Sequence, residues 1–349
     1  LNQGLNVYTS FNQDYQKVVE KSASEYTKDS KVETSSIVVE PYTSKILAII
    51  GGKDYASSQF NRATQANRQI GSTIKPLLYY LALENGFTPA TTFLCEPTTF
   101  KLDDNSTYSP SNFNDKYAYK DVTLAQAIAV SDNIFAVKTH LFLGTDNLAS
   151  LIKKFGIKDV KANASLALGT LNTNIYNLAN MYNCLASEGK YNHLYTIEKI
   201  TNDAGKVLYQ HEQEDKQLLE QDSCLELSQL LTSTFNSTFS TYLQATMASY
   251  QLDNINACKT GSTDVDNLAV AYNPQVLVAS WVGYDDNRKM ETADDKTVAK
   301  KTVIDVLNYT NENKDVTWYQ PTEDLQQIAI NPLTGDFDEN GTVYWFKKD

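Results

Sequence analysis

Residues 68–80 read RQIGSTIKPLLYY, and they predict a helix that begins near Ser72 and is buried along one face. The apolar side chains of residues 74–82 recur at i, i+3, i+4, i+7 and i+8, which is the spacing of an amphipathic helix. Pro76 is compatible with this helix because it stands so near the start that about one hydrogen bond at most is lost. Asn85-Gly86 is a typical helix stop.

Ser72 and Lys75 lie three residues apart, so both lie on one face of this helix. A lysine in a helix leans back toward the N-terminus, and it activates a serine when burial or nearby positive charge lowers its pKa. The free N–H groups and the positive end of the helix dipole favour a developing anion. The alternative is that Ser72 caps the helix and Lys75 points into solvent. SxxK alone does not decide, because it recurs at Ser150–Lys153 and Ser187–Lys190.

Two further short strings follow in order, Ser131-Asp-Asn133 and Lys259-Thr-Gly-Ser262. Ser131 is suited to relay a proton, and Asn133 is suited to hold a substrate amide and the lysine. The alternative for this pair is an N-cap before the helix predicted at 134–143.

The Lys259 string lies on a predicted strand, whose edge can pair with an extended peptide. Gly261 would let a peptide backbone approach closely, hydroxyl groups suit a carboxylate, and Lys259 supplies a positive field. The alternative is a turn entering residues 264–267. The residues predicted to bind substrate here are Thr260, Gly261, Ser262 and Thr263.

Strands are predicted near both ends of the main block. The β-branched runs at 36–40 and 45–50 predict a hairpin, and three further strands are predicted at 255–259, 268–272 and 276–284. Helices are predicted at 123–130, 134–143, 148–155, 175–188, 222–249 and 297–307. This order indicates an α+β fold, in which one antiparallel sheet is built from both ends of the chain and lies between helices, with a mostly helical insert.

Composition excludes several classes of protein. The chain has 349 residues with 30 basic and 42 acidic side chains, and a net charge of −12 argues against a nucleic-acid surface. Four widely spaced cysteines without a CxxC pair do not support a zinc site, although one disulfide remains open. The three histidines have no metal-type spacing, and neither a GxSxG elbow nor a glycine-rich phosphate loop is present.

The chain begins with Leu1 and shows no signal peptide, so we expect a fragment of a longer protein. Its longest strongly apolar run, Ile46–Ile50, is far shorter than the ~20 residues that span a bilayer. The predicted organisation is a lead-in segment at 1–34 from a missing upstream region, a main domain at 35–312 and a C-terminal appendage at 313–349.

SxxK, SDN and KTG in this order are the signature of penicillin-binding proteins and class A β-lactamases. The surrounding sequence resembles the transpeptidase domain of class A, bifunctional penicillin-binding proteins over roughly residues 4–310. The opening GLNVYTSFNQDYQ resembles the stretch that joins this domain to an upstream glycosyltransferase. The segments that carry the resemblance are Ile46–Tyr55 (ILAIIGGKDY), Phe60–Pro76 (FNRATQANRQIGSTIKP), Ser131–Lys138 (SDNIFAVK) and Trp281–Asp286 (WVGYDD).

The resemblance implies a five-stranded antiparallel sheet sandwiched by helices, plus a mostly helical subdomain, with the active site at their junction. It implies that Ser72 forms an acyl-enzyme with a D-Ala-D-Ala stem peptide, releases D-alanine and passes the acyl group to an amine of a neighbouring stem. This reaction cross-links peptidoglycan for cell-wall biogenesis and cell shape. β-Lactam antibiotics would acylate the same serine.

The same resemblance implies a role for each motif residue. Lys75 would be the general base, Ser131 with Asn133 would handle proton transfer and substrate placement, and Lys259 with Thr260 and Ser262 would bind the terminal carboxylate. The backbone N–H groups of Ser72 and Ser262 would form the oxyanion hole. No metal or cofactor is implied.

The implied partners are the stem peptides and β-lactams, without nucleic acid. The implied location is the extracytoplasmic face of the bacterial membrane, through an N-terminal anchor that this chain lacks.

Three questions stay open from the sequence. Cys258 stands where the family has a small residue, and it either points into the core or lines the cleft. A β-lactamase would need a glutamate-positioned water, and no ExxLN-like string lies between Ser131 and Lys259. A non-catalytic β-lactam sensor or scaffold would keep Ser72 on the same fold.

Overall fold

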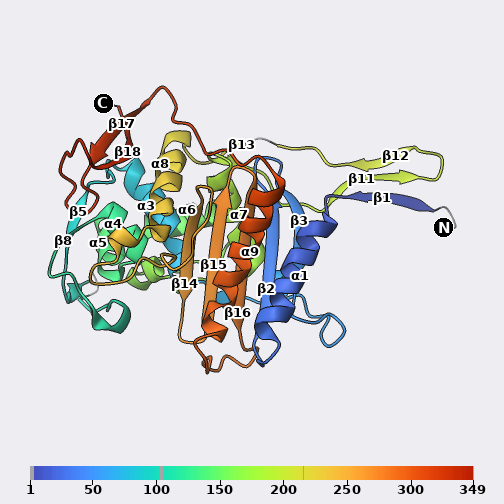
Figure 1. Ribbon diagram of the computed structural model, residues 1–349, viewed down its shortest axis with the longest axis horizontal. Helices are drawn as coiled ribbons and strands as arrows, with labels where there is room; N and C mark the ends of the chain where they lie inside the picture. Colours follow the sequence, from blue (N-terminus) through green and yellow to red (C-terminus); the bar gives the residue numbers. More distant parts are fainter. Residues whose placement is uncertain (1–3, 103–104, 215, 349) are drawn as a thin grey trace.

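The computed structural model describes residues 4–102, 105–214 and 216–348, so both extreme ends of the predicted lead-in and tail, 1–3 and 349, lie outside the described residues. A five-stranded antiparallel sheet of order β14-β15-β16-β2-β3 stands at its centre (Figure 1). Its strands are β2 (Glu33–Glu40), β3 (Lys45–Ile50), β14 (Ala257–Ser262), β15 (Asp266–Asn273) and β16 (Val276–Gly283). The predicted α+β fold with one sheet built from both ends of the chain is confirmed.

The two halves of the sheet meet where β2 pairs with β16, with Val38 opposite Val278. Side chains alternate between the faces of each strand. In β15, Val270 therefore joins the larger hydrophobic core, whereas its neighbours Ala269 and Ala271 join a second core on the other face. The sheet is buried on both sides, which explains why its strands read as nearly continuous apolar runs.

One face of the sheet is covered by α1 (Gln13–Thr27) and α9 (Val298–Asn313), which lie side by side in front of it in Figure 1. The side chain of Asn12 caps α1 by accepting from two backbone N–H groups. Tyr15 is buried between the helices, and its hydroxyl lies 3.0 Å from Thr310 Oγ1. The helix expected at 297–307 is confirmed and extends further to Asn313.

The other face carries the larger core and most of the helices. The helices predicted at 123–130, 134–143, 148–155 and 175–188 are confirmed with small shifts at their ends. The helices on this side are α2 (Arg62–Gln65), α3 (Lys75–Glu84), α4 (Leu124–Val130), α5 (Asn133–Leu143), α6 (Thr145–Lys154), α7 (Ile175–Ala186) and α8 (Gln221–Leu231).

The helix predicted over 222–249 is wrong beyond Leu231. The chain continues through two short 3-10 turns, η4 (Thr232–Phe235) and η5 (Ser237–Phe239), into an irregular segment. Three consecutive hydroxyl side chains, Thr232, Ser233 and Thr234, donate to the carbonyl three residues earlier at 2.7, 2.6 and 3.0 Å. Such bonds compete with the helical pattern, so this run of Ser and Thr ends the helix.

Several short two-stranded sheets lie between these helices or beside them. The polar segment before α4 contains β5 (Thr92–Cys95), β6 (Phe100–Lys101) and β7 (Thr107–Tyr108), and β5 pairs with β8 (Lys120–Thr123). Strand β6 pairs with β7, and two further pairs are β4 (Arg68–Gln69) with β9 (Asn172–Thr173) and β10 (Lys190–Tyr191) with β13 (Lys216–Gln217).

A hairpin of β11 (Ile197–Asn202) and β12 (Val207–Gln210) joins β1 (Leu5–Thr9) in a sheet that projects from the body in Figure 1.

The C-terminal segment forms a hairpin of β17 (Leu325–Ile330) and β18 (Thr342–Lys347) that packs on α8. Gln229 Oε1 accepts the backbone N–H of Trp345 at 2.7 Å, and the Trp345 side chain is buried. The domain boundaries after residues 34 and 312 stay predictions. In the part of the chain that the structure describes, no helix has the length and apolar character needed to cross a membrane.

Candidate active site

Ser72 lies in a 3-10 turn, η1 (Gly71–Ile74), that continues directly into α3. Gly71 makes this position possible, because its φ is +54° and a Cβ there would lie 2.8 Å from the carbonyl oxygen of Ser262. The turn therefore rests against the end of β14. The caps of η1 and α3 are Ile70 and Ile74, so the alternative in which Ser72 caps the helix is not what the structure shows.

Lys75 is fully buried, so the alternative in which it points into solvent is wrong. Its Nζ donates to Asn133 Oδ1 at 2.8 Å, to Ser131 O at 2.9 Å and to Asp132 O at 3.1 Å, and it lies 3.3 Å from Ser131 Oγ. Burial lowers the pKa of Lys75 to about 7, and the nearby Asp132 carboxylate opposes that shift. A lysine with this pKa is partly neutral at physiological pH and has a lone pair available.

The SDN string forms the tight junction between α4 and α5. Ser131 ends α4 in the left-handed region, with φ 60° and ψ 45°, which costs about 1 kcal/mol for a residue with a Cβ. Asp132 then caps α5 by accepting the N–H of Phe135 at 2.7 Å. The predicted cap is therefore present at Asp132, while the neighbouring Ser131 and Asn133 point their polar atoms at Lys75.

Lys259 completes the cluster from β14. Its Nζ donates to Ser131 Oγ at 2.9 Å and to the carbonyl of Thr260 at 2.8 Å, and its side chain is fully buried. Burial, followed by the positive charge of Lys75, lowers the pKa of Lys259 well below its usual range. The Ser131 hydroxyl is thus shared by two buried lysines, which gives an unbroken polar path between them.

Of the other residues in the KTG string and its following turn, some line the cleft and others stabilise the fold. Thr260 and Ser262 line the cleft, and Ser262 Oγ donates to Asn267 Oδ1 at 2.6 Å. A Cβ at Gly261 would lie 2.5 Å from the carbonyl of Ile70, so this glycine is required by the packing of η1. Thr263 Oγ1 accepts the N–H groups of the two residues at the β14–β15 turn, at 3.2 and 2.9 Å.

The cleft has a volume of about 840 Å³, and Ser72, Ser131 and Asn133 are half-buried residues that line it. Two segments supply most of its remaining wall, residues 111–114 with Lys116, and residues 240–246. Lys116 and Lys300 also line it, and the described lining residues include neither Asp nor Glu. In a chain with a net charge of −12, this cleft is electrostatically suited to an anionic ligand.

Cys258 points into the core. It is adjacent to Lys259 on β14, so its side chain lies on the opposite face of the sheet, in the core covered by α1 and α9. Burial raises the pKa of its thiol to about 12, which makes it unreactive at neutral pH. All four cysteines are free and buried, so the open question of a disulfide is answered.

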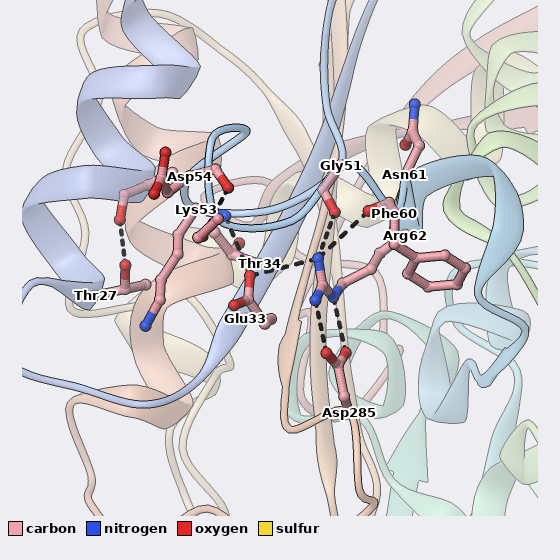
Figure 2. Close-up of polar contacts among 12 residues, drawn as sticks. Thr27, Glu33, Thr34, Gly51, Lys53, Asp54, Phe60, Asn61, Arg62 and Asp285 are labelled. Atoms are coloured by element: carbon pink, nitrogen blue, oxygen red, sulfur yellow. Dashed lines mark hydrogen bonds and ion pairs between the residues drawn. The ribbon is translucent and has the colours of Figure 1, made fainter.

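Arg62 and Arg68, which are not among the residues predicted from the sequence, bind carboxylates at the ends of the sheet strands. Arg62 is buried and binds the carboxylate of Asp285 with two hydrogen bonds of 2.8 and 2.6 Å (Figure 2). Its third nitrogen donates to the carbonyl of Gly51 at 3.1 Å and lies 3.5 Å from Glu33 Oε2. This network ties the loop before Ser72 to the ends of β3, β16 and β2.

Arg68 lies three residues before Gly71 and makes a second such tie. It donates to Asp266 Oδ1 at 2.9 and 2.7 Å, and the indole N–H of Trp281 donates to the same oxygen at 2.8 Å. Asp266 is the first residue of β15, directly after the turn that follows Ser262. Sequence spacing gives no signal for these pairs, because Arg62 and Arg68 lie 223 and 198 residues from their carboxylate partners.

Comparisons with known proteins agree with this geometry. The family model described as penicillin binding protein transpeptidase domain matches residues 34–294. Penicillin-binding protein 2D of Bacillus subtilis (strain 168) is 38% identical over 337 residues, which are 95% of this chain and 49% of that protein. Penicillin-binding protein 1A of Aquifex aeolicus (strain VF5) is 33% identical over 312 residues, which are 86% of this chain and 41% of that protein.

Among solved structures, penicillin-binding protein 1A from Haemophilus influenzae superimposes with a TM-score of 0.80 at 23% identity. The alignment covers 90% of this chain and 53% of that chain. At this identity the likeness concerns the fold, and it matches the sheet and helices described above. The chain spans about half the length of the curated relatives it matches.

Proposed function

Because the chain belongs to the penicillin-binding protein transpeptidase family, we propose that it is a serine-type peptidoglycan D,D-transpeptidase with Ser72 as its nucleophile. The observation that carries the proposal is the convergence of three distant strings on one hydroxyl. Lys75 Nζ and Lys259 Nζ lie 3.3 and 2.9 Å from Ser131 Oγ, across sequence separations of 56 and 128 residues. SxxK occurs three times in the chain, whereas only the string at Ser72 has its lysine buried in this cluster, and a buried lysine near a serine suits activation of that serine.

The first half of the proposed reaction is acylation. Neutral Lys75 takes the hydroxyl proton of Ser72 as Ser72 Oγ attacks the carbonyl carbon of the D-Ala-D-Ala bond. The tetrahedral intermediate then expels the terminal D-alanine, whose nitrogen receives that proton from Lys75 through the Ser131 hydroxyl, to which Lys259 also donates. The products are a Ser72 ester and free D-alanine, and the pKa of Lys75, lowered to about 7, suits this exchange at neutral pH.

Substrate placement follows from the charge of the cleft. The terminal carboxylate would lie near Thr260 and Ser262, in the positive field of Lys259. The absence of Asp and Glu from the described lining residues supports an anionic ligand. The backbone N–H groups of Ser72 and Ser262 are proposed as the oxyanion hole, because Gly71 lets the two segments approach closely.

The second half is aminolysis of the ester. An amine of a neighbouring stem attacks the acyl carbon, loses a proton to the Lys75–Ser131 pair, and Ser72 leaves with its own proton restored. The result is a new peptide bond, the cross-link. β-Lactams would acylate Ser72 by the same first step and remain bound. Action on stem peptides at the extracytoplasmic face of the membrane belongs to this proposal.

The residues that line the cleft also argue against the alternative that the chain is a β-lactamase. Rapid hydrolysis of the ester needs a base that positions water, such as a glutamate. The described lining residues provide no carboxylate for that role. Slow release of a penicilloyl group is therefore expected.

The proposal is tested by incubating the chain with a D-Ala-D-Ala stem peptide and an amine acceptor, followed by mass spectrometry. Released D-alanine and a new amide between the two peptides support a transpeptidase. Hydrolysis without amide formation points to a carboxypeptidase, and rapid turnover of a penicillin in a parallel incubation points to a β-lactamase. A penicillin adduct without any stem-peptide reaction would favour a sensor and contradict the proposal.

A further inference from the structure

Asp132, the middle residue of the SDN string, has no role in the steps above, yet its carboxylate is among the most fully bonded groups of the molecule. It is completely buried. Its Oδ1 accepts the backbone N–H of Phe135 at 2.7 Å, which is the helix cap. Its Oδ2 accepts three more donors: the thiol of Cys95 at 2.9 Å, the amide of Asn112 at 2.6 Å and the hydroxyl of Tyr242 at 2.7 Å.

The three donors to Oδ2 come from three separate segments. Cys95 ends β5, Asn112 precedes the 3-10 turn η2 (Phe113–Asp115), and Tyr242 lies in the irregular segment after η5. Asn112 and Tyr242 line the cleft themselves, one in each of the two wall segments. One carboxylate therefore joins both wall segments to the junction of α4 and α5. A helix cap requires only the bond to Phe135, so the other three donors need another explanation.

Asn112 extends the network to the lysine. Its Oδ1 accepts the backbone N–H of Asn133 at 2.7 Å, while Asn133 Nδ2 donates to the carbonyl of Ser111 at 2.7 Å. Asn133 Oδ1 then accepts from Lys75 at 2.8 Å. Asp132 therefore helps to orient the Asn133 side chain through Asn112. The oriented Asn133 amide in turn accepts a hydrogen bond from Lys75.

The carboxylate also contributes charge. Two charged groups interact electrostatically with Lys75 of α3: Asp132 at the α4–α5 junction and Lys259 of β14. Asp132 itself interacts with Tyr79 of α3, Cys95 and Tyr242. Asp132 is the anion that raises the pKa of Lys75 against the effect of burial. Removing its charge while keeping its shape would therefore lower the pKa of the base.

We propose that Asp132 is a positioning residue of acylation, whose carboxylate joins the two wall segments of the cleft to the Ser131–Asn133 turn and so holds Asn133 and Lys75 in place. The inference rests on the proposed function, because it concerns the same reaction at Ser72. It assigns Asp132 no contact with the substrate.

The test is the second-order rate constant of acylation by a penicillin, measured from pH 5.5 to 9 for the wild type and Asp132→Asn. An amide cannot accept from all four donors, so the rate constant at pH 8 is expected to fall about tenfold or more. The pH midpoint of the rate is expected to move below that of the wild type, since the base loses its neighbouring anion. A merely structural cap would leave this midpoint unchanged.

Two further variants keep the test decisive. Glu220→Gln removes a carboxylate that caps α8 outside the cleft lining, and both the rate constant and the midpoint are expected to stay at wild-type values. Tyr242→Phe removes one donor and no charge, so the rate constant is expected to fall while the midpoint stays. Should Asp132→Asn fail to fold, wild-type acylation by Tyr242→Phe overturns the proposal.

A folded Asp132→Asn variant with the wild-type rate and midpoint overturns it equally. A wild-type chain that no penicillin acylates would instead contradict the proposed function.

Discussion

Lys259 donates a hydrogen bond from its Nζ to Ser131 Oγ over 2.9 Å, although the two residues are 128 positions apart in the chain. The bond joins the edge strand of the sheet to the junction of two helices on the other side of the cleft. Lys75 lies 3.3 Å from the same oxygen. Ser131 is therefore the point at which the sheet and the helical part share one polar group.

Ser131→Ala is expected to lower the rate of acylation by a penicillin about 10²- to 10⁴-fold, because the hydroxyl that links the two lysines is lost. Stopped-flow or quenched mass spectrometry measures the rate. Ser111→Ala is the matched control, since Ser111 lines the same cleft and contributes its backbone carbonyl to Asn133. Equal rates for the two variants would refute a role for the Ser131 hydroxyl.

The rate of acylation is expected to rise with pH through a midpoint near 7. Burial lowers the pKa of Lys75 to about 7, and only the neutral amine accepts a proton, so the rate should increase as pH rises through that value and level off above it. Lys75→Arg should be inactive at every pH, because a guanidinium stays protonated. A flat profile between pH 6 and 9 would show that another group is the base.

Gly71→Ala is expected to abolish most of the acylation. The substitution strains a φ of +54° and brings a Cβ within 2.8 Å of the Ser262 carbonyl, so the Ser72 turn must move away from β14. Gly86→Ala is the control: its φ is +84°, and nothing lies near the added Cβ. Both variants should lose roughly 1–2 kcal/mol of stability from backbone strain, but only Gly71→Ala should lose activity.

Arg68→Ala is expected to destabilise the fold by roughly 2–4 kcal/mol in urea unfolding. It leaves the buried Asp266 carboxylate with the indole of Trp281 as its remaining side-chain donor, and an uncompensated buried charge is costly. Lys17→Ala removes an exposed ion pair with Asp14 and should change stability by less than about 1 kcal/mol. A similar small effect for both would mean that the Arg68 pair does not hold the loop.

Glu226→Gln is expected to stabilise the protein at alkaline pH. Burial raises the pKa of Glu226 to about 7, against the opposing effect of Lys347. The folded state therefore keeps this proton between pH 4.5 and 7 where the unfolded state has lost it, and the stability falls as pH rises through that interval.

At pH 8.5 the Gln variant should be roughly 1–3 kcal/mol more stable than the wild type, and at pH 4.5 the two should be nearly equal. Urea unfolding at both pH values measures this. The exposed Glu212→Gln should have no such pH-dependent effect, and a Glu226→Gln gain that is equal at both pH values would contradict the account.

Much of this architecture could be predicted because its signals are local. The 3.6-residue period of 74–82 predicted α3, and the β-branched runs predicted both halves of the sheet. The order of SxxK, SDN and KTG indicated which serine to choose among three. The burial of Cys258 in the core could also have been predicted, because it is adjacent to Lys259 on a strand and successive side chains of a strand point to opposite faces.

The remainder depends on contacts that sequence spacing does not encode. The helix predicted over 222–249 failed because hydroxyl groups after Leu231 bond back to the helix carbonyls. The partners of Arg68 and Asp132 lie up to 216 and 110 residues away, and no periodicity links them. The long-range contacts of Arg68 and Asp132 were therefore missed, whereas the three short motifs could be read directly from the sequence.

The most direct test of the central claim is to map the site of penicillin attachment. The folded chain is incubated with a labelled penicillin, digested and analysed by mass spectrometry, beside Ser72→Ala and Ser150→Ala. The account predicts one stable adduct on the peptide that contains Ser72, absent from Ser72→Ala and unchanged in Ser150→Ala, the serine of a second SxxK string. An adduct that survives Ser72→Ala, or none on the folded wild type, would contradict it.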